Sequence, residues 1–419
     1  MNIAIIASGS RGDVQPYLAL GVGLNKAGHH VRFVTNSNYA DLIRNYEVDP
    51  WLVAGDVQAV AKSASMQDQV ASGNFIRLMA EMSKAAKSHA LHLGKTCLAA
   101  CQDMDVILGG LGGVFVASAL GEKLIIPVLQ AYLVPFTRTR AFASPLTPSL
   151  PIFKGASYLF AQQLIWQGFR SAENALRREV LDLPKAPFFG PYWSEAFHGM
   201  PVLYGFSPAV IRKPEDWGEQ IHVTGYWTLP EKEEWQPDPA LSAFLNQNPR
   251  PIYIGFGSMP SRNPEETARM FLDALQAVGQ RAVIYSGWAG FEKLETSDSV
   301  FVTSSVPHTW LFPRVAAVIH HGGAGTTAAG LRAGVPHVVI PHFGDQPFWG
   351  MRVAALGVGS QPIPRKKLTA SLLAEAIHEV TSDQAMRSRA SSLGEQIRQE
   401  DGVRKAVKVI EDALVTDNL

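Results

Sequence analysis

The sequence predicts an α/β protein made of two Rossmann-like halves, each with a parallel sheet. Short apolar runs alternate with longer stretches in which apolar residues recur at helical spacing, a pattern typical of strand–helix–strand units. This rhythm stops once, between Ile211 and Pro239, in a segment rich in Pro, Glu, Lys and Trp, and then restarts. Glycines follow several of the apolar runs, and the carboxyl ends of strands are where parallel sheets bind ligands.

The composition is that of an ordinary globular chain, with 419 residues of which 47% are hydrophobic. Lys and Arg (37) balance Asp and Glu (37), so no net charge favours nucleic acid or an anionic membrane. Cys97 and Cys101 lie one helical turn apart, and we interpret them as core thiols in a reducing cytoplasm. Met1 leads directly into an apolar strand without signal-peptide features, and no apolar run reaches the ~18 residues of a spanning helix. We therefore expect a cytoplasmic protein.

The N-terminal half opens with a strand at 3–7, a loop at 8–15, a helix that begins at Pro16 and a second strand at 31–35. The loop of this β-α-β unit lies at the carboxyl edge of the sheet, so the carboxylate of Asp13 is predicted to face a ligand crevice. The alternative is that Asp13 only caps the following helix, which is a common role for Asp.

Residues 131–151 form an apolar loop whose only charges are Arg138 and Arg140. A long apolar loop beyond a strand is usually functional, and it indicates one wall of an apolar acceptor pocket. A helix is expected to follow at 158–181, with most of its apolar residues in the core. The aromatic residues that we assign to the acceptor site are Phe136, Phe142 and Trp166.

The C-terminal half repeats the strand and helix pattern after a predicted linker. Strands are expected at 251–256, 282–285, 315–319 and 337–341, and helices at 264–278, 328–333, 368–380, 386–397 and 403–414.

The most informative stretch is His-His-Gly-Gly-Ala-Gly-Thr-Thr at 320–327. A strand, a glycine turn and a helix N-terminus form an anion site, because free N–H groups and the positive helix end point the same way. His321 can add a donor, and downstream Asp345 and Gln346 can hold hydroxyl groups, so the pattern indicates a nucleotide sugar. The alternatives are a plain tight connection and a satisfied buried pair made by His320 and His321.

Several motifs together resemble the sterol 3-beta-glucosyltransferases, and more broadly glycosyltransferase family 1, which includes the bacterial antibiotic glycosyltransferases. The match extends from Met1 to about residue 400. The motifs are Gly9–Tyr17, Phe206–Pro208, Asp216–Gly218, Val223–Trp227, 320–327, Arg332–Pro336 and Phe343–Gln346.

This resemblance implies a GT-B fold, with two Rossmann-like domains facing across a cleft. We assign 1–213 to the acceptor domain, 214–248 to a linker, 249–398 to the donor domain and 399–419 to a helix that returns to the first domain. The family chemistry is metal-independent and inverts the anomeric carbon. Asp103-Met104-Asp105 looks like the D-x-D metal motif of another sugar-transferase class, but it precedes a strand, so we predict no metal site.

The resemblance also implies the roles of individual residues. Asp13 is the implied general base, and His321 is the implied second catalytic residue. The implied donor-site residues are Ser10, Ser258, Val306, His321, Gly323, Gly325, Thr326, Asp345 and Gln346. Plant members of the family usually place a His where this chain has Asp13. An ordinary Asp has a pKa of ~3.9, so it acts on an alcohol only if proton transfer is concerted with attack or burial raises its pKa.

The sequence therefore predicts transfer of a hexose, with glucose from UDP-glucose preferred, to an apolar alcohol such as a sterol or triterpenoid. UDP-sugar is a co-substrate, and no cofactor is expected. A TDP-sugar donor and a polyketide, macrolide or flavonoid acceptor form the alternative, and a sugar-nucleotide epimerase of GT-B fold is a remoter one. We expect no nucleic-acid partner. Contact of the apolar loop with a membrane surface is a further expectation.

Overall fold

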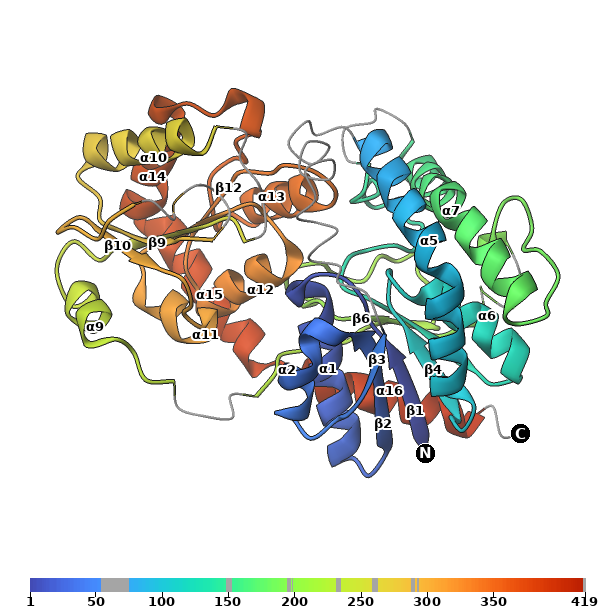
Figure 1. Cartoon of the computed structure of the whole chain (residues 1–419). Coiled ribbons are helices and arrows are strands. Elements are labelled where there is room, and N and C mark those ends of the chain that lie inside the picture. Colours follow the sequence, from blue (N-terminus) through green and yellow to red (C-terminus); the bar gives the residue numbers. More distant parts are fainter. Residues whose placement is uncertain are drawn as a thin grey trace. The chain divides into compact units, whose positions relative to one another are not determined.

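The chain forms two compact units (Figure 1). The computed structural model describes residues 1–53, 75–147, 153–193, 197, 199–230, 235–257, 263–287, 291 and 294–416. Of these, the first unit holds 1–53, 76–230 and 400–416, and the second holds 235–399. Each unit contains one parallel sheet with helices on both faces, so the predicted fold class is confirmed.

The sheet of the first unit has seven parallel strands in the order β3-β2-β1-β4-β5-β6-β7. The strands are β1 (Asn2–Ile6), β2 (His30–Asn36), β3 (Asp49–Val53), β4 (Val106–Gly109), β5 (Val128–Tyr132), β6 (Val202–Tyr204) and β7 (Ile221–Val223). The helices are α1 (Arg11–Lys26), α2 (Ala40–Arg44), α5 (Phe75–Cys101), α6 (Val114–Leu124), α7 (Lys154–Glu179) and α16 (Gly402–Thr416), with a short 3-10 turn at Ser37–Tyr39.

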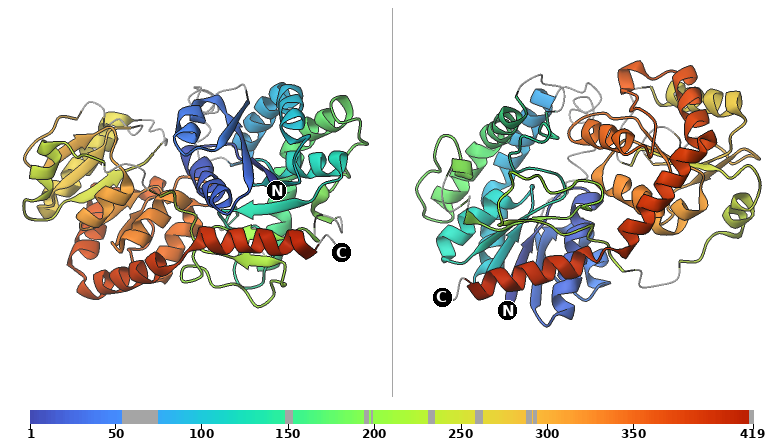
Figure 2. Two further views of the ribbon diagram at one scale, coloured as in Figure 1. Left: turned by 90° about the horizontal axis from the view of Figure 1, so that it is seen from below. Right: turned by 180° about the vertical axis from the view of Figure 1, so that it is seen from behind.

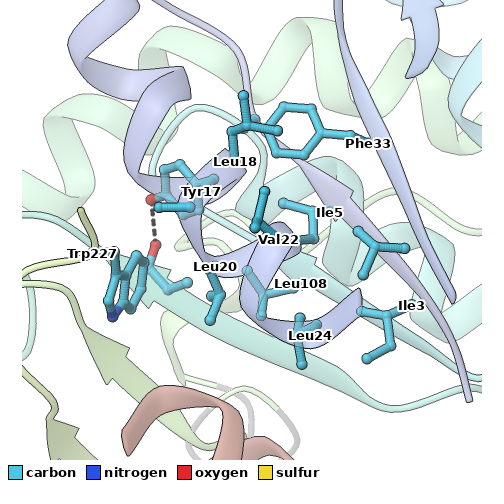
Figure 3. Close-up of a cluster of buried hydrophobic side chains, with 14 of the residues drawn as sticks. Ile3, Ile5, Tyr17, Leu18, Leu20, Val22, Leu24, Phe33, Leu108 and Trp227 are labelled. Carbon is cyan, nitrogen blue, oxygen red and sulfur yellow. Dashed lines mark hydrogen bonds between the residues drawn. The ribbon is translucent and has the colours of Figure 1, made fainter. Parts of the chain in front are cut away.

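The two faces of this sheet bury alternate residues of each strand, because successive side chains of a strand point to opposite faces. On β1, Ile3 and Ile5 join the core that contains α1 and α16, whereas Ala4 and Ile6 join the core that contains α5, α6 and α7. Figure 3 shows the first of these cores, in which Tyr17 donates a hydrogen bond to a backbone carbonyl. Both strand faces are therefore covered, as parallel sheets require.

The two cysteines lie in the second of these cores. Cys97 and Cys101 are fully buried free thiols on α5. Burial raises the pKa of Cys101 to about 12 and also raises that of Cys97. The prediction of core thiols is confirmed.

The last helix, α16, packs against α1 within the first unit (Figure 2). Two of the motifs quoted for the family resemblance hold the chain where it enters this helix. The Ser207 hydroxyl donates to Glu400 Oε1 at 2.6 Å, and a Cβ at Gly402 would lie 2.5 Å from the backbone carbon of Gly225. The close approach therefore requires glycine at 402. Gly225 has a φ of +110°, and this backbone conformation requires glycine at 225.

The sheet of the second unit has five parallel strands in the order β10-β9-β8-β11-β12. The strands are β8 (Ile252–Gly255), β9 (Ala282–Tyr285), β10 (Val300–Thr303), β11 (Val318–His320) and β12 (His337–Val339). The helices are α9 (Pro239–Leu245), α10 (Pro264–Val278), α11 (His308–Leu311), α12 (Ala324–Ala333), α13 (Gln346–Ala355), α14 (Ala370–Ser382) and α15 (Gln384–Gln399), with 3-10 turns at Phe312–Arg314 and Arg365–Lys367.

Several features differ from the sequence prediction. Helix α1 begins at Arg11, five residues before Pro16, and α12 begins at Ala324, four residues before Ala328. The segment 214–248, predicted as a linker, contains β7 and α9. The three-residue strands β6 and β7 were not predicted, because so short a run shows no periodicity.

In the described part of the chain, no helix combines the length and the apolar character needed to span a bilayer.

Candidate active site

The strand order places the predicted catalytic residues of both units at topological switch points. In the first sheet the order reverses between β1 and β4, and in the second between β8 and β11. Loops that leave neighbouring strands in opposite directions open a crevice there, which is where such sheets bind ligands. Asp13 follows β1, and the 320–327 turn follows β11. Each candidate residue therefore lies where its own sheet is built to hold a ligand.

Asp13 is the third residue of α1, where it forms a capping box with Ser10. Its Oδ2 accepts from the Ser10 backbone N–H at 2.7 Å and from the Ser10 hydroxyl at 2.8 Å. Within the described residues Oδ1 has no hydrogen bond. The capping alternative is therefore correct for one oxygen, and the other remains able to accept from a substrate hydroxyl. Ser10, predicted to bind the donor, is paired with Asp13.

The strand β2 and the turn after it hold the loop that carries Asp13. The Ser8 hydroxyl donates to Asn36 Oδ1 at 2.8 Å, and the Tyr39 hydroxyl donates to the Gly9 carbonyl at 3.0 Å. Asn36 and Tyr39 were not predicted as site residues, because only the pairing of β1 with β2 brings them to this loop.

The surroundings raise the pKa of Asp13 above its ordinary value even though the side chain is solvent-exposed. Desolvation by the surrounding protein is the largest cause, and the two hydrogen bonds from Ser10 oppose it. A raised pKa makes the ionised carboxylate a stronger base towards an alcohol.

The 320–327 turn forms an anion cradle at the start of α12. Gly323 is the N-cap residue and has no side chain to cap the helix. The Thr327 N–H donates to the Gly323 carbonyl at 2.9 Å and so closes the first helical turn. The N–H groups of Ala324, Gly325 and Thr326 find no acceptor among the described residues. Three unpaired donors at the positive end of a helix bind a phosphate group.

Two glycines give this turn its shape. Gly322 has a φ of +90°, and a Cβ there would lie 2.7 Å from Val339 Cγ1 and 2.9 Å from the Gln346 carbonyl oxygen. A Cβ at Gly323 would lie 2.5 Å from His321 Nε2. Side chains at either position would displace the neighbours that form the cradle.

His321 lies beside the cradle as a neutral imidazole. Desolvation, together with the smaller effect of the neighbouring His308, lowers its pKa to about 4. Its Nδ1 is buried without a partner in the described residues, while Cε1 would lie 3.4 Å from a Cβ at Gly257, which follows β8. A neutral ring carries one N–H, so His321 can donate one hydrogen bond to an anion.

His320 does not pair with His321. Its Nδ1 accepts from the Gly322 N–H at 3.0 Å, so the neutral ring carries its hydrogen on Nε2, which lies 2.9 Å from His337 Nδ1. Both rings are fully buried, and desolvation lowers the pKa of His337 to about 3. The alternative of a satisfied buried pair between His320 and His321 is therefore wrong. His320 instead bonds to His337, which joins β11 to β12, and accepts from the Gly322 N–H, which fixes the glycine turn.

Gln346 and Asp345, also predicted to bind the donor, both accept hydrogen bonds from residues near the start of α13. Gln346 Oε1 accepts from the backbone N–H groups of His342 (2.8 Å) and Phe343 (3.3 Å), and Asp345 Oδ2 accepts from Trp349 Nε1 at 2.7 Å. These bonds fix the start of α13, which lies against Gly322.

Two further donor-site predictions depend on loops of the second unit. Val306 is partly buried against a core cluster after β10. Ser258 lies outside the described residues.

The aromatic residues assigned to the acceptor site are mostly core residues. Phe136 is 3% exposed and Trp166 is 1% exposed, and Trp166 Nε1 donates to the Phe188 carbonyl at 2.9 Å. In this arrangement neither ring presents surface to a ligand. Phe142 is partly exposed in the same loop.

Tyr204 of β6 and Asp216, in the segment between β6 and β7, anchor the apolar loop instead. Asp216 accepts from the Thr139 hydroxyl at 2.6 Å and from the Arg140 N–H at 2.7 Å. The Tyr204 hydroxyl accepts from the Thr137 N–H at 2.6 Å, and its ring stacks on Trp217 at 4.8 Å. The Asp216–Gly218 motif was quoted for the resemblance without a role, and the structure gives it one.

The D-x-D sequence is occupied by structural contacts. Asp103 pairs with Arg32 at 2.5 Å, and Asp105 Oδ2 accepts from the Asn2 N–H at 2.7 Å. Both carboxylates therefore hold the N-terminal edge of the first sheet.

Two family models match the chain, one over the N-terminal part and one over the C-terminal part. Residues 3–143 match the glycosyltransferase family 28 N-terminal domain, and residues 269–411 match the C-terminal domain of erythromycin biosynthesis protein CIII-like proteins.

Solved structures show the same fold. The chain is similar to the glycotransferase of kitacinnamycin, with a TM-score of 0.68, 19% identity and 99% of both chains covered. It is also similar to glycosyltransferase VinC in complex with DTDP, with a TM-score of 0.67, 16% identity, and 98% of this chain and 99% of that chain covered. The two sheets therefore have the GT-B architecture.

Curated relatives extend along nearly the whole chain. A sterol 3-beta-glucosyltransferase of Arabidopsis thaliana is 36% identical over 97% of this chain and 65% of its own length, and a second one is 34% identical over 97% of this chain and 67% of its own length. A Cryptococcus neoformans sterol 3-beta-glucosyltransferase is 35% identical over 98% of this chain, which spans only 27% of that protein. The chain belongs to the glycosyltransferase family that includes the sterol 3-beta-glucosyltransferases.

Proposed function

We propose that the chain is an inverting glucosyltransferase that moves glucose from UDP-glucose to the hydroxyl of a sterol or a related apolar alcohol. Its family membership supports sugar transfer, and the names of its relatives support a sterol acceptor. The observation that carries the proposal is which groups lie at the two switch points. Among the described residues, Asp13 has one oxygen without a hydrogen bond, and the turn before α12 has three N–H groups without an acceptor beside the neutral His321.

In the proposed reaction the acceptor hydroxyl donates a hydrogen bond to Asp13 Oδ1. Its oxygen attacks C1 of glucose from the face opposite UDP, and its proton passes to Asp13. The bond from C1 to the β-phosphate oxygen breaks, and its electron pair leaves with the diphosphate. The N–H groups of 324–326 and His321 then stabilise the negative charge that develops on UDP. A single displacement inverts the anomeric carbon.

The charge on the leaving diphosphate needs no metal ion in this proposal, because helix α12 supplies the compensating dipole. A helix N-terminus contributes ~0.3–1 kcal/mol when exposed and up to ~2 kcal/mol when partly buried. The nucleotide sugar is a co-substrate, and the reaction uses no further cofactor.

Two alternatives differ in substrate or in reaction. One structural neighbour is named as the glycotransferase of kitacinnamycin, and another, VinC, is in complex with DTDP. A TDP-sugar donor with a secondary-metabolite acceptor is therefore the second candidate. A sugar-nucleotide epimerase would cleave the same anomeric bond without needing an acceptor.

A mass-spectrometric screen separates these candidates. The enzyme is incubated with UDP-glucose or TDP-glucose and with a sterol, a triterpenoid, a macrolide, a flavonoid or no acceptor. We expect a sterol glucoside from UDP-glucose. A product only from a macrolide or flavonoid would support the second candidate, and an epimerised sugar or a glycal without acceptor would support the epimerase.

A further inference from the structure

A row of exposed aromatic side chains runs along one face of α7. Among the described residues, every Phe classed as exposed lies here, at 91% for Phe153, 46% for Phe160, 57% for Phe188 and 61% for Phe189. We call these four residues the α7 aromatic strip. The apolar loop predicted at 131–151, which was expected to contact a membrane, is largely buried over its described residues, 131–147.

The spacing of the helix brings the strip together. Phe153 and Phe160 are seven residues apart, so they lie on the same face of α7 two turns from each other. Gln163 and Gln167 continue that face, and their side chains donate to the carbonyl oxygens of Phe189 (2.7 Å) and Phe188 (2.8 Å). From Phe153 to Gln167 the strip therefore covers ~21 Å of helix length.

The same contacts force the two rings of the 188–189 pair outwards. Trp166 Nε1 also donates to the Phe188 carbonyl, so three side-chain donors hold this backbone against α7. The rings contact each other edge to face at 5.2 Å, and the Arg170 guanidinium lies 4.5 Å from the Phe188 ring. Their exposure is thus fixed by the fold, and an apolar patch of this kind marks an interaction site.

The sequence around the start of the strip is basic. From Lys123 to Ala172 the sequence has five basic residues and no acidic one. Arg138 and Lys154 are exposed at the start of α7, where the Arg138 side chain lies against Gly155 and Lys154 Nζ donates to the Ala141 carbonyl at 3.0 Å. Aromatic side chains with a basic fringe match the surface of a bilayer that contains anionic lipids.

We propose that the α7 aromatic strip inserts into the headgroup region of an anionic lipid bilayer and holds the first unit at the membrane surface. The Phe rings enter the apolar boundary, and Arg138, Lys154 and Arg170 contact lipid phosphates. This deepens the proposed function, because a sterol acceptor resides in a bilayer and would reach the enzyme without crossing water. The binding itself does not depend on the enzyme's activity.

Co-sedimentation of the full chain with vesicles tests the proposal. The probes are vesicles of phosphatidylcholine, vesicles of phosphatidylcholine with about 30% phosphatidylserine, and both compositions with added sterol. The phosphatidylserine supplies a negative surface charge like that of a cytoplasmic leaflet. We expect binding to the phosphatidylserine vesicles with or without sterol, and release by salt. Substitution of the strip by F153S/F160S/F188S/F189S is expected to weaken this binding about tenfold or more.

Two control variants separate the strip from general surface effects. Met351 and Leu372 are exposed at 55% and 41% in the second unit, so M351S/L372S removes exposed apolar surface away from the strip and should bind like the wild type. R138Q/K154Q should lose binding to anionic vesicles about tenfold, whereas K366Q/K367Q, which removes two exposed lysines elsewhere, should not.

Other results would overturn the proposal. These are a wild type that binds no vesicle, a strip variant that binds as well as the wild type, or a wild type that self-associates through the strip without binding vesicles, measured by sedimentation velocity. The strip variant should keep the wild-type melting temperature and its turnover of a sterol delivered in cyclodextrin. If no variant shows turnover but the vesicle results hold, only the proposed function fails.

Discussion

Asp13 carries two roles that a single substitution can separate. Asn at this position still accepts the Ser10 hydrogen bonds through one oxygen, but it cannot take a proton. We predict that Asp13→Asn lowers turnover by about 10²–10⁴-fold while UDP-glucose binding is retained. Turnover comes from mass spectrometry of the glucoside, and binding comes from calorimetry with UDP.

The pH dependence provides an independent check on Asp13. The base must be ionised, so activity falls as the pH is lowered through its pKa, which desolvation raises above the ordinary 3.8. The wild type should therefore show an acid limb above pH 3.8 that is missing from the residual activity of Asp13→Asn. Equal turnover of the two enzymes at pH 7 would rule out the base assignment.

The anion cradle depends on the backbone of Gly322, and Gly344 offers a matched control. Both have positive φ, +90° and +65°, but a Cβ at Gly344 would meet nothing within 4 Å. Gly344→Ala should cost only the ~1–2 kcal/mol of the left-handed conformation. Gly322→Ala should cost more in urea unfolding and weaken UDP binding at least about tenfold, because its Cβ displaces Val339 and the start of α13. Equal losses of UDP binding would contradict the assigned cradle.

At the scale of elements, the loop after β5 is predicted to depend on its anchor, Asp216. Asp216→Ala removes both acceptor oxygens, so the Thr139 hydroxyl and the Arg140 N–H lose their partner. We predict that KM for the acceptor rises roughly threefold to tenfold, since a loop freed at one end positions the acceptor less well. KM for UDP-glucose should not change, and a change in the donor KM alone would refute this role of the loop.

The elements also explain what the sequence could and could not predict. Long strands and helices were predictable from apolar spacing, as was the strand, glycine turn and helix start at 318–327. The early start of α1 has a local signal, since Ser10 and Asp13 have capping-box spacing, and Pro16 drew the prediction away from it. The pairing of His320 with His337 has no such signal, because it depends on which strands are neighbours. The exposure of Phe153 and Phe160 also has no signal in the sequence, because they recur at the same helical spacing as residues of the core.

At the scale of the whole molecule, the contact of α1 with α16 should be limiting for the stability of the first unit. A Cβ at Gly23 would overlap Val403 on α16, so Gly23→Ala is predicted to cost ~1–3 kcal/mol. The double variant with Val403→Ala should recover most of this loss, as a double-mutant cycle in urea would measure. Gly199→Ala, where a Cβ meets nothing within 4 Å, is the neutral control. Additive losses in the cycle would show that the two positions do not couple.

The position of α16 has a consequence for biosynthesis. The core of the first unit includes Ala406, Val407, Ile410 and Leu414, which the ribosome delivers only after the whole second unit. The first unit therefore cannot complete its core until the second unit has been translated. In nascent chains the first unit should stay protease-sensitive until α16 has emerged, and a rearranged chain in which α16 precedes β1 should acquire resistance earlier in synthesis.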